Sequence, residues 1–176
     1  MIITETILKG CFTIQPKVFK DDRGYFFESY NQQSFEEIIG EKIAFVQDNQ
    51  SLSSYGTVRG LHFQKGENAQ AKLVRVIQGR VLDIAVDLRK ESSTYGQWCG
   101  VELSEENNLQ LYIPRGFAHG FSVISDTAIF SYKCDNYYNK ASEGGIIYND
   151  KTLHIDWQVP EDKMILSEKD LILPNL

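Results

Sequence analysis

The chain has 176 residues, which is long enough for a proper hydrophobic core, and we expect one domain over residues 1–176. Its net charge of -6 at pH 7 and its lack of a basic run argue against nucleic acid as a partner. No apolar run reaches membrane-spanning length and the N-terminus has no signal-peptide pattern, so we expect no membrane association. Three scattered cysteines without metal-ligand spacing favour reduced thiols and a cytoplasmic location.

The N-terminal part of the chain predicts short strands and one helix. Strands are expected where aromatic and β-branched residues cluster, at residues 11–14, 17–19 and 25–30, with a turn at 21–24. Ser34 and Glu37 have capping-box spacing and Gly40 can end a helix, which predicts a short helix over 34–39. Residues 45–51 are expected to pass from a strand into a polar loop.

The middle of the chain concentrates charged side chains on apolar strands. Residues 58–64 predict a strand, 65–68 a connection, and 69–76 the next strand back. Arg59 and His62 would face opposite sides of a regular strand, so one shared site requires a bulge or bend at Gly60. Residues 78–79 predict a hairpin turn. In the following strand, 81–88, even positions are apolar while odd positions include Asp83 and Asp87, which predicts one core face and one mixed face.

The second half predicts further strands at 98–103, 107–113, 121–124 and 128–134, and a polar end, 166–170, that folds back over the sheet. Many short strands separated by Gly, Pro, Asn and Asp turns predict an all-β fold of the β-sandwich or jelly-roll type.

The spacing of Pro114, Gly116 and His119 resembles the second motif of the cupins, a turn that presents one histidine into a β-barrel mouth. Metal-binding cupins carry two further histidines and a glutamate on an earlier strand. Here that strand has only His62, with Gln64 at the second position, so we expect no metal.

His62 and Lys72, close together in sequence, suggest proton chemistry at carbon. An imidazole can take a proton near neutral pH, and an ammonium group can hold the negative charge that remains. A lone strand histidine is more often structural, but burying it beside Arg59 and Lys72 without a function would be costly. For His119 the sequence favours neither a structural nor a functional role over the other.

Several blocks together resemble the dTDP-4-dehydrorhamnose 3,5-epimerase family, nearly end to end and in order. The main blocks are TVRGLHFQ at 57–64, QAKLVRV at 70–76, IPRGFAHGF at 113–121 and YKCDNYY at 132–138. Shorter blocks are DRG at 22–24, FVQDN at 45–49 and LSEKD at 166–170. The loop at 65–68 lacks the family's usual proline. The resemblance implies a cupin-type jelly roll, a homodimer, no cofactor, and a nucleotide-linked 4-keto-6-deoxyhexose as substrate.

By this resemblance His62 is the base, oriented by Asp170, Lys72 stabilises the enolate oxygen, and Tyr132 returns a proton to the opposite face. The resemblance also implies a set of substrate-binding residues, to which Lys72 belongs as well. The other members of this set are Phe19, Arg23, Phe26, Glu28, Gln47, Asp48, Asn49, Arg59, His119, Tyr138, Glu143 and Lys169. The resemblance also implies a position near the sugar for His119, with Asp83 as its partner, and a role for the segment 19–28 in the site of a neighbouring subunit.

Other functions remain open at this point. A relative that epimerises only C3 or only C5, or that isomerises the ketone, would share the fold and His62. A non-catalytic cupin that binds sugar nucleotides would need no pairing of Tyr132 with His62. A metal-dependent oxygenase is disfavoured by the ligand count.

Overall fold

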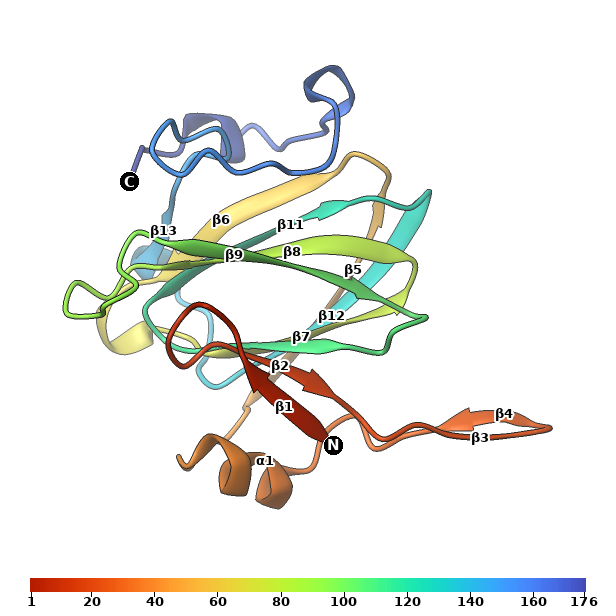
Figure 1. Ribbon diagram of the computed structural model, residues 1–176. Coiled ribbons are helices and arrows are strands. Elements are labelled where there is room, and N and C mark those ends of the chain that lie inside the picture. Colours follow the sequence, from red (N-terminus) through yellow and green to blue (C-terminus); the bar gives the residue numbers. More distant parts are fainter.

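Two antiparallel sheets, packed face to face, make up most of the computed structural model, which describes residues 1–176 (Figure 1). The six-stranded sheet has the order β1 (Ile2–Glu5), β2 (Phe12–Gln15), β10 (Gln110–Ile113), β7 (Lys72–Gln78), β12 (Thr127–Cys134), β5 (Gln47–Ser54). The five-stranded sheet has the order β13 (Glu143–Gly145), β6 (Val58–Gln64), β11 (Phe117–Val123), β8 (Arg80–Asp87), β9 (Trp98–Ser104). The predicted all-β class is confirmed.

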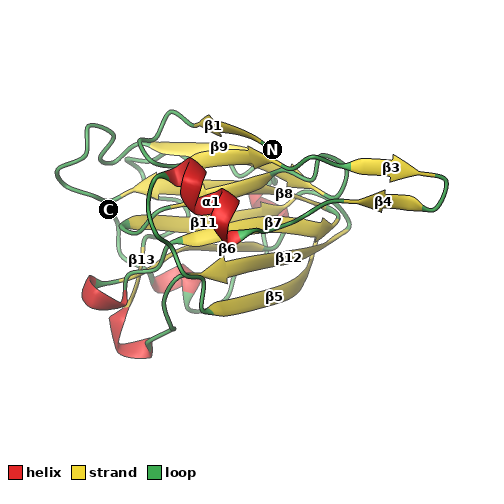
Figure 2. Ribbon diagram, turned by 90° about the horizontal axis from the view of Figure 1, so that it is seen from below, coloured by secondary structure: helices red, strands yellow, loops and turns green.

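The remaining elements lie outside the two sheets. A hairpin of β3 (Phe19–Asp21) and β4 (Gly24–Phe26) projects from the body as an arm, and the helix α1 (Gln32–Ile39) packs on the six-stranded sheet (Figures 1 and 2). Short 3-10 helices are η1 (Gly66–Asn68), η2 (Lys140–Ser142), η3 (Glu161–Lys163) and η4 (Asp170–Ile172). None of the helices combines the length and the apolar character that crossing a membrane would require.

Strand β8 lies at the centre of the packing and is buried on both faces. Val81 and Ala85 face the core between the sheets, while Leu82, Ile84 and Val86 pack against the C-terminal segment around Trp157. Leu166 packs against the same cluster and Asp170 contacts His62, so the prediction that residues 166–170 fold back over the sheet is confirmed. The prediction of one apolar face and one mixed face on this strand is also confirmed, and both faces are buried. Asp83 and Asp87 point into the interior with no exposed surface.

The connections around β6 and β7 differ from the expected hairpins. β6 pairs with β11 and β13 in the five-stranded sheet, whereas β7 pairs with β10 and β12 in the six-stranded sheet. The turn at Gly79, with a φ of 79°, likewise carries the chain from one sheet to the other. His62 and Lys72 therefore stand on opposite walls of the sandwich, which opens space between them.

Two further boundaries were predicted wrongly. The helix begins earlier than expected, because the side chain of Asn31 rather than Ser34 caps it by accepting a hydrogen bond from the backbone N–H of Ser34. Gly40 ends the helix in the left-handed conformation, as predicted. The polar residues after position 47 form the edge strand β5 instead of a loop, because their alternate side chains face a polar cavity and the outside.

Candidate active site

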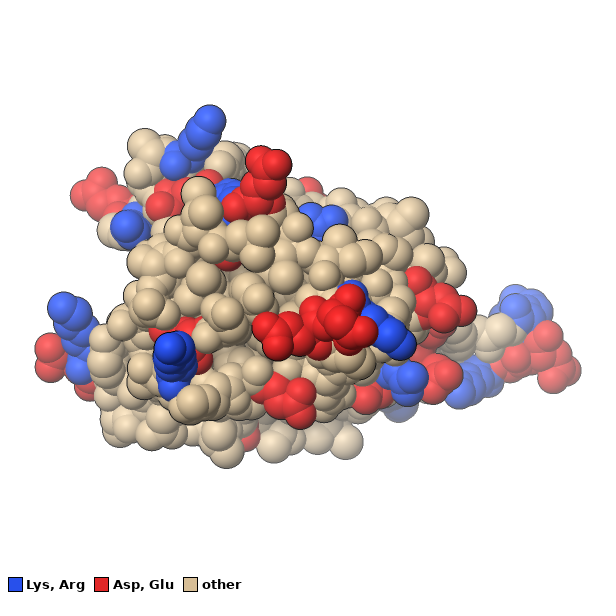
Figure 3. All heavy atoms as spheres, turned by 90° about the horizontal axis from the view of Figure 1, so that it is seen from above, with Lys and Arg blue, Asp and Glu red and all other residues tan.

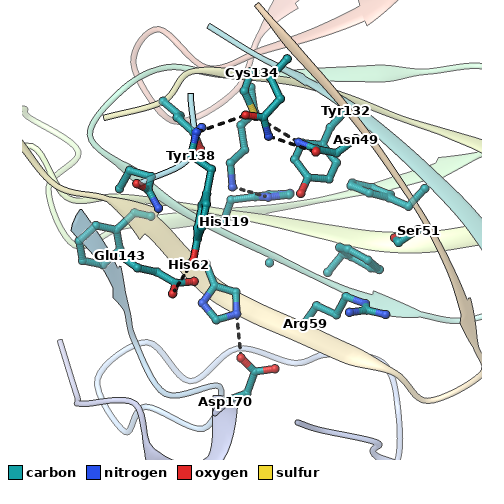
Figure 4. Close-up of a pocket in the computed structure, with 18 of the residues that line it drawn as sticks. Asn49, Ser51, Arg59, His62, His119, Tyr132, Cys134, Tyr138, Glu143 and Asp170 are labelled. Carbon is teal, nitrogen blue, oxygen red and sulfur yellow. Dashed lines mark hydrogen bonds and ion pairs between the residues drawn. The ribbon is translucent and has the colours of Figure 1, made fainter. Parts of the chain in front are cut away.

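A cavity of about 620 Å³ opens between the two sheets at the ends of β6, β7, β11 and β12, partly covered by the C-terminal segment. This volume is typical of pockets that bind small organic ligands. Most of the predicted site residues line it: Gln47, Asn49, Arg59, His62, Lys72, His119, Tyr132, Tyr138, Glu143, Lys169 and Asp170. Figure 4 shows that they come from both walls and from the C-terminal segment.

Gly60 explains how Arg59 and His62 reach the same cavity. Opposite β11, three steps from Arg59 to His62 match only two steps from Phe121 to His119, so β6 carries one extra residue. Gly60 has a φ of 120°, and a Cβ there would lie 2.6 Å from the Cα atom of Gly120. The predicted bend at this glycine is confirmed, because a side chain would fit neither the conformation nor the space.

The imidazole of His62 contacts the carboxylate of Asp170, which belongs to the C-terminal segment. Its Nε2 atom lies 2.7 Å from Oδ1 of Asp170, and its Nδ1 atom has no hydrogen-bond partner. The hydroxyl of Ser167 donates to Oδ2 of Asp170 at 2.9 Å. Burial opposes ionisation of Asp170, but the contacts with His62 and Ser167 outweigh it and hold the pKa of this carboxyl below its usual value.

A second imidazole–carboxylate pair lies deeper. Nε2 of His119 is 3.0 and 2.9 Å from the two carboxylate oxygens of Asp83, and its Nδ1 is 3.5 Å from Nζ of Lys72. Burial lowers the pKa of His119, with Lys72 acting in the same direction and Asp83 against it. Burial also lowers the pKa of Lys72 against the Asp83 charge, and it raises the pKa of Asp83 against the contacts with His119 and Lys72. The cavity therefore contains a continuous polar chain from the core to its wall.

Tyr132 lies on the wall opposite His62. It projects from β12, and Nζ of Lys72 lies 5.7 Å from the centre of its ring. Phe121 and Phe130 stack at 4.2 Å between their ring centres and make the apolar floor beside it. Burial raises the pKa of the Tyr132 phenol, so the group keeps its proton. The cavity thus has proton-carrying groups on two facing walls, and the amine of Lys72 lies beside the phenol on one of them.

Comparison with known proteins agrees with this geometry. Residues 5–176 match the family described as dTDP-4-dehydrorhamnose 3,5-epimerase. The Salmonella typhimurium enzyme of that name is 56% identical over 179 residues, covering 100% of this chain and 96% of its own. The chain belongs to the dTDP-4-dehydrorhamnose 3,5-epimerase family. The predicted family and its epimerase activity are confirmed.

Two solved structures of the family extend the match to the whole fold. The dTDP-4-dehydrorhamnose 3,5-epimerase of Elizabethkingia anophelis is 60% identical, with a TM-score of 0.97 over 100% of this chain and 96% of its own. The 3,5-epimerase of Legionella pneumophila, in complex with dTDP-4-keto-L-rhamnose, is 46% identical, with a TM-score of 0.92 over 99% and 98% of the two chains. The predicted cupin-type jelly roll is thereby confirmed.

The rim of this epimerase cavity is tied together by charged and polar contacts. Glu143 pairs with Lys169 and accepts a hydrogen bond from the Tyr138 hydroxyl at 3.3 Å. These contacts hold the pKa of Glu143 below its usual value. They also join β13 to the segment that carries Asp170. Arg59 is steadied by a 3.2 Å hydrogen bond from its Nε to the hydroxyl of Ser53.

Strand β5 of the epimerase divides its polar residues between two faces. Asn49 stands opposite Tyr132 in the β5–β12 pairing and faces the cavity, where Gln47 donates to it at 3.1 Å. Asp48, opposite Lys133, faces outward and binds its ammonium group at 2.9 and 3.0 Å. The sequence block therefore placed Asp48 with the cavity residues, but the alternation of the strand turns it away.

Four other predicted binding residues do not line the cavity of their own chain. Phe19, Arg23 and Phe26 lie on the projecting arm, and Glu28 follows it. Arg23 instead forms an exposed ion pair with Asp21 at 2.5 Å. Charged side chains of both signs gather at the end of the arm, far from the body of the molecule (Figure 3).

The cavity also includes residues that sequence reasoning did not select: Gln50, Ser51, Phe63, Gln64, Gln70, Gly120, Phe121, Phe130, Cys134 and Ser167. Strand alternation could have found several of them, because Gln64 lies two residues after His62 and Cys134 two after Tyr132. Gln64 accepts a hydrogen bond from the backbone N–H of Asn139 at 3.0 Å. The chain brings together no group of three His, Cys, Asp or Glu side chains suited to hold a metal ion.

Proposed function

We propose that the cavity binds dTDP-4-dehydro-6-deoxy-D-glucose and inverts C3 and C5 to give dTDP-4-dehydro-L-rhamnose. The observation that carries this proposal is the arrangement of His62 on one wall and Lys72 and Tyr132 on the other, around one cavity. Inversion requires a base on one face of the sugar and an acid on the other, and the two sheets supply them.

The first step in the proposal is proton removal from C3 or C5. Both carbons flank the C4 ketone, so the electrons of the broken C–H bond form a C=C bond and charge moves onto the ketone oxygen. His62 takes the proton, while Asp170 orients the ring and stabilises the imidazolium that forms. The ammonium group of Lys72 stabilises the enolate oxygen, which is worth on the order of 3 kcal/mol in comparable sites.

The second step is proton return from the opposite face. Tyr132 lies across the cavity from His62, and burial raises the pKa of its phenol, which keeps the proton in place until the enolate carbon takes it. The tyrosinate then recovers a proton from solvent and His62 releases its own. The cycle needs no redox partner, because electrons and protons balance within it.

We further propose that the enzyme works as a homodimer in which the arm of one protomer completes the cavity of its partner. Phe19 and Phe26 are more than half exposed on this arm, and the Arg23 guanidinium beside them suits a phosphate group. A projecting hairpin whose exposed aromatic side chains have no cover on their own chain is explained if it packs on a second copy.

Mixing two inactive variants tests the arm. Arg23→Ala protomers keep an intact cavity, and His62→Ala protomers keep an intact arm. Mixed dimers should regain activity if the arm acts in the partner's site, because one of the two sites is then fully wild type. If mixtures stay as inactive as the separate variants, the arm acts within its own chain.

Residues 1–176 act as one domain in this proposal, since both sheets and the C-terminal segment contribute to the same cavity. A reducing compartment, the cytoplasm, suits the three free cysteines, Cys11, Cys99 and Cys134, all buried.

Proton NMR of the keto-sugar nucleotide in heavy water, with purified enzyme and a chelator present, tests the activity. We expect deuterium at both C3 and C5 and an L-sugar product. Exchange at one carbon alone would assign a single epimerase, and no exchange would leave a non-catalytic binding protein. Loss of activity on chelation would contradict the metal-free mechanism.

A further inference from the structure

We infer that Asp83 is a positioning residue of this site, which acts through His119 to keep the Lys72 side chain charged and directed at the substrate oxygen. The inference rests on the proposed role of Lys72 and adds a group that touches no substrate. Asp83 lies behind His119 on the central strand β8 and has no exposed surface.

The partners of Asp83 distinguish it from the other buried aspartate on the same strand. Asp87 accepts hydrogen bonds from Arg89, Ser92 and Thr94, which fully satisfy it as a structural group. Asp83 has only the Nε2 atom of His119 within hydrogen-bond distance of its side chain. A buried carboxylate with one partner is costly to the fold, and that partner is a ring that faces the cavity.

This contact determines the protonation of His119. A carboxylate only accepts, so Nε2 of His119 must donate to Asp83 and carries the ring proton. Nδ1 is left with its lone pair, and it accepts from Nζ of Lys72 at 3.5 Å. The three linked groups are therefore the carboxylate of Asp83, the neutral imidazole of His119 and the ammonium group of Lys72, and their charges sum to zero.

Other charged groups near Lys72 do not replace Asp83. Tyr132 and Cys134 on β12 both have raised pKa values through burial and remain neutral. On the facing wall Arg59 and His62 supply no negative charge. The remaining cavity carboxylates are engaged elsewhere, Asp170 with His62 and Glu143 with Lys169. Asp83 is thus the anion that offsets the burial of Lys72, which by itself lowers the pKa of the amine.

Asp83→Asn isolates the charge, because the amide keeps an acceptor oxygen and nearly the same volume. Losing the negative charge lowers the pKa of Lys72 further, so the alkaline limb of kcat should move to lower pH, by about one unit. Activity should recover towards the wild-type level on the acid side of that limb. Asp87→Asn is the matched control, since it removes an equally buried carboxylate and should leave the limb in place.

Cyanate reports the same change without the substrate, because it carbamylates only neutral amines. At a fixed pH near neutrality, a one-unit shift makes Lys72 react about tenfold faster in Asp83→Asn than in the wild type. Peptide mass spectrometry measures the rate, with the surface residue Lys133 as the internal reference. An unchanged rate at Lys72 together with an unchanged alkaline limb would overturn the inference.

The activity of the variant Lys72→Met separates a failure of this inference from a failure of the proposed function. If Lys72→Met abolishes activity but Asp83→Asn shifts neither limb nor labelling, only the role of Asp83 is wrong. If Lys72→Met retains full activity, the proposed role of Lys72 fails first. Should Asp83→Asn not fold, as judged by its thermal melt, Asp83→Ser removes the same negative charge with a smaller polar side chain. The same limb shift is then expected, and its absence contradicts the inference.

Discussion

The cavity contains two imidazole–carboxylate pairs that differ in depth and in what the second ring nitrogen meets. At the mouth, His62 is 28% exposed at its side chain and Asp170 5%. In the core, His119 is 7% exposed and Asp83 not at all. Nδ1 of His62 has no hydrogen-bond partner, whereas Nδ1 of His119 lies beside Lys72. The same two residue types therefore form a base in the His62–Asp170 pair and support a cation in the His119–Asp83 pair.

The origin of each carboxylate explains the contrast. Asp170 comes from the C-terminal segment, where contacts with His62 and Ser167 hold its pKa below the usual value. Asp83 comes from the central strand, where burial raises the pKa. Burial disfavours the charged form of Asp83, whereas the contacts of Asp170 favour its charged form. The pair at the mouth, His62 and Asp170, is therefore the one that can exchange protons with a bound sugar.

The largest expected effect separates the two pairs by activity. Asp170→Asn leaves the His62 ring without its carboxylate, so kcat should fall on the order of 10²-fold or more, with little change in KM. The kcat of Asp83→Asn, measured at the acid end of its pH profile, should fall far less than that of Asp170→Asn. Steady-state kinetics of the two variants checks this, and equal losses would remove the distinction between base and support.

Tyr132→Phe sharpens the comparison by removing the acid and leaving both pairs intact. Proton abstraction by His62 should continue, so solvent exchange persists while inversion slows by roughly 10²-fold. NMR in heavy water follows both rates in one sample. Exchange and inversion that both remain at the wild-type rate would place the acid elsewhere.

The titration of the two carboxyls gives a third, smaller contrast. As pH falls, Asp83 should gain its proton first, because its pKa is raised, and Asp170 last, because its pKa is lowered. The stability that Asp170 contributes is present above its unfolded pKa of about 3.9 and is lost as pH falls through its lower folded value. Carbon NMR of labelled aspartate side chains measures both midpoints, and the reverse order would contradict the account.

Asp48→Ala should have almost no effect, in contrast to both pairs. Asp48 faces away from the cavity and forms only a surface pair with Lys133, which is worth under about 1 kcal/mol. Asn49→Ala, one residue along and facing inward, should raise KM. A clear loss of activity in Asp48→Ala alone would show that the alternation of β5 was misread.

The sequence was sufficient for the residue types that carry the chemistry and for the bend at Gly60, because both depend on local patterns. It was insufficient for the pairing of the strands. His62 and Lys72 were expected on consecutive strands of one hairpin, yet they stand on opposite sheets, since the contacts that choose the partners of β6 and β7 are distant in the chain. The side to which Asp48 points required that register as well.

Solvent exchange in His62→Ala tests the central claim most directly. Proton NMR of the keto-sugar nucleotide in heavy water should show no deuterium at C3 or C5, because one imidazole serves both carbons. His154→Asn is the control, since His154 is exposed and its φ of 47° is one that asparagine tolerates. It should exchange at the wild-type rate. Retained exchange at either carbon in His62→Ala would contradict the assignment of His62 as the base.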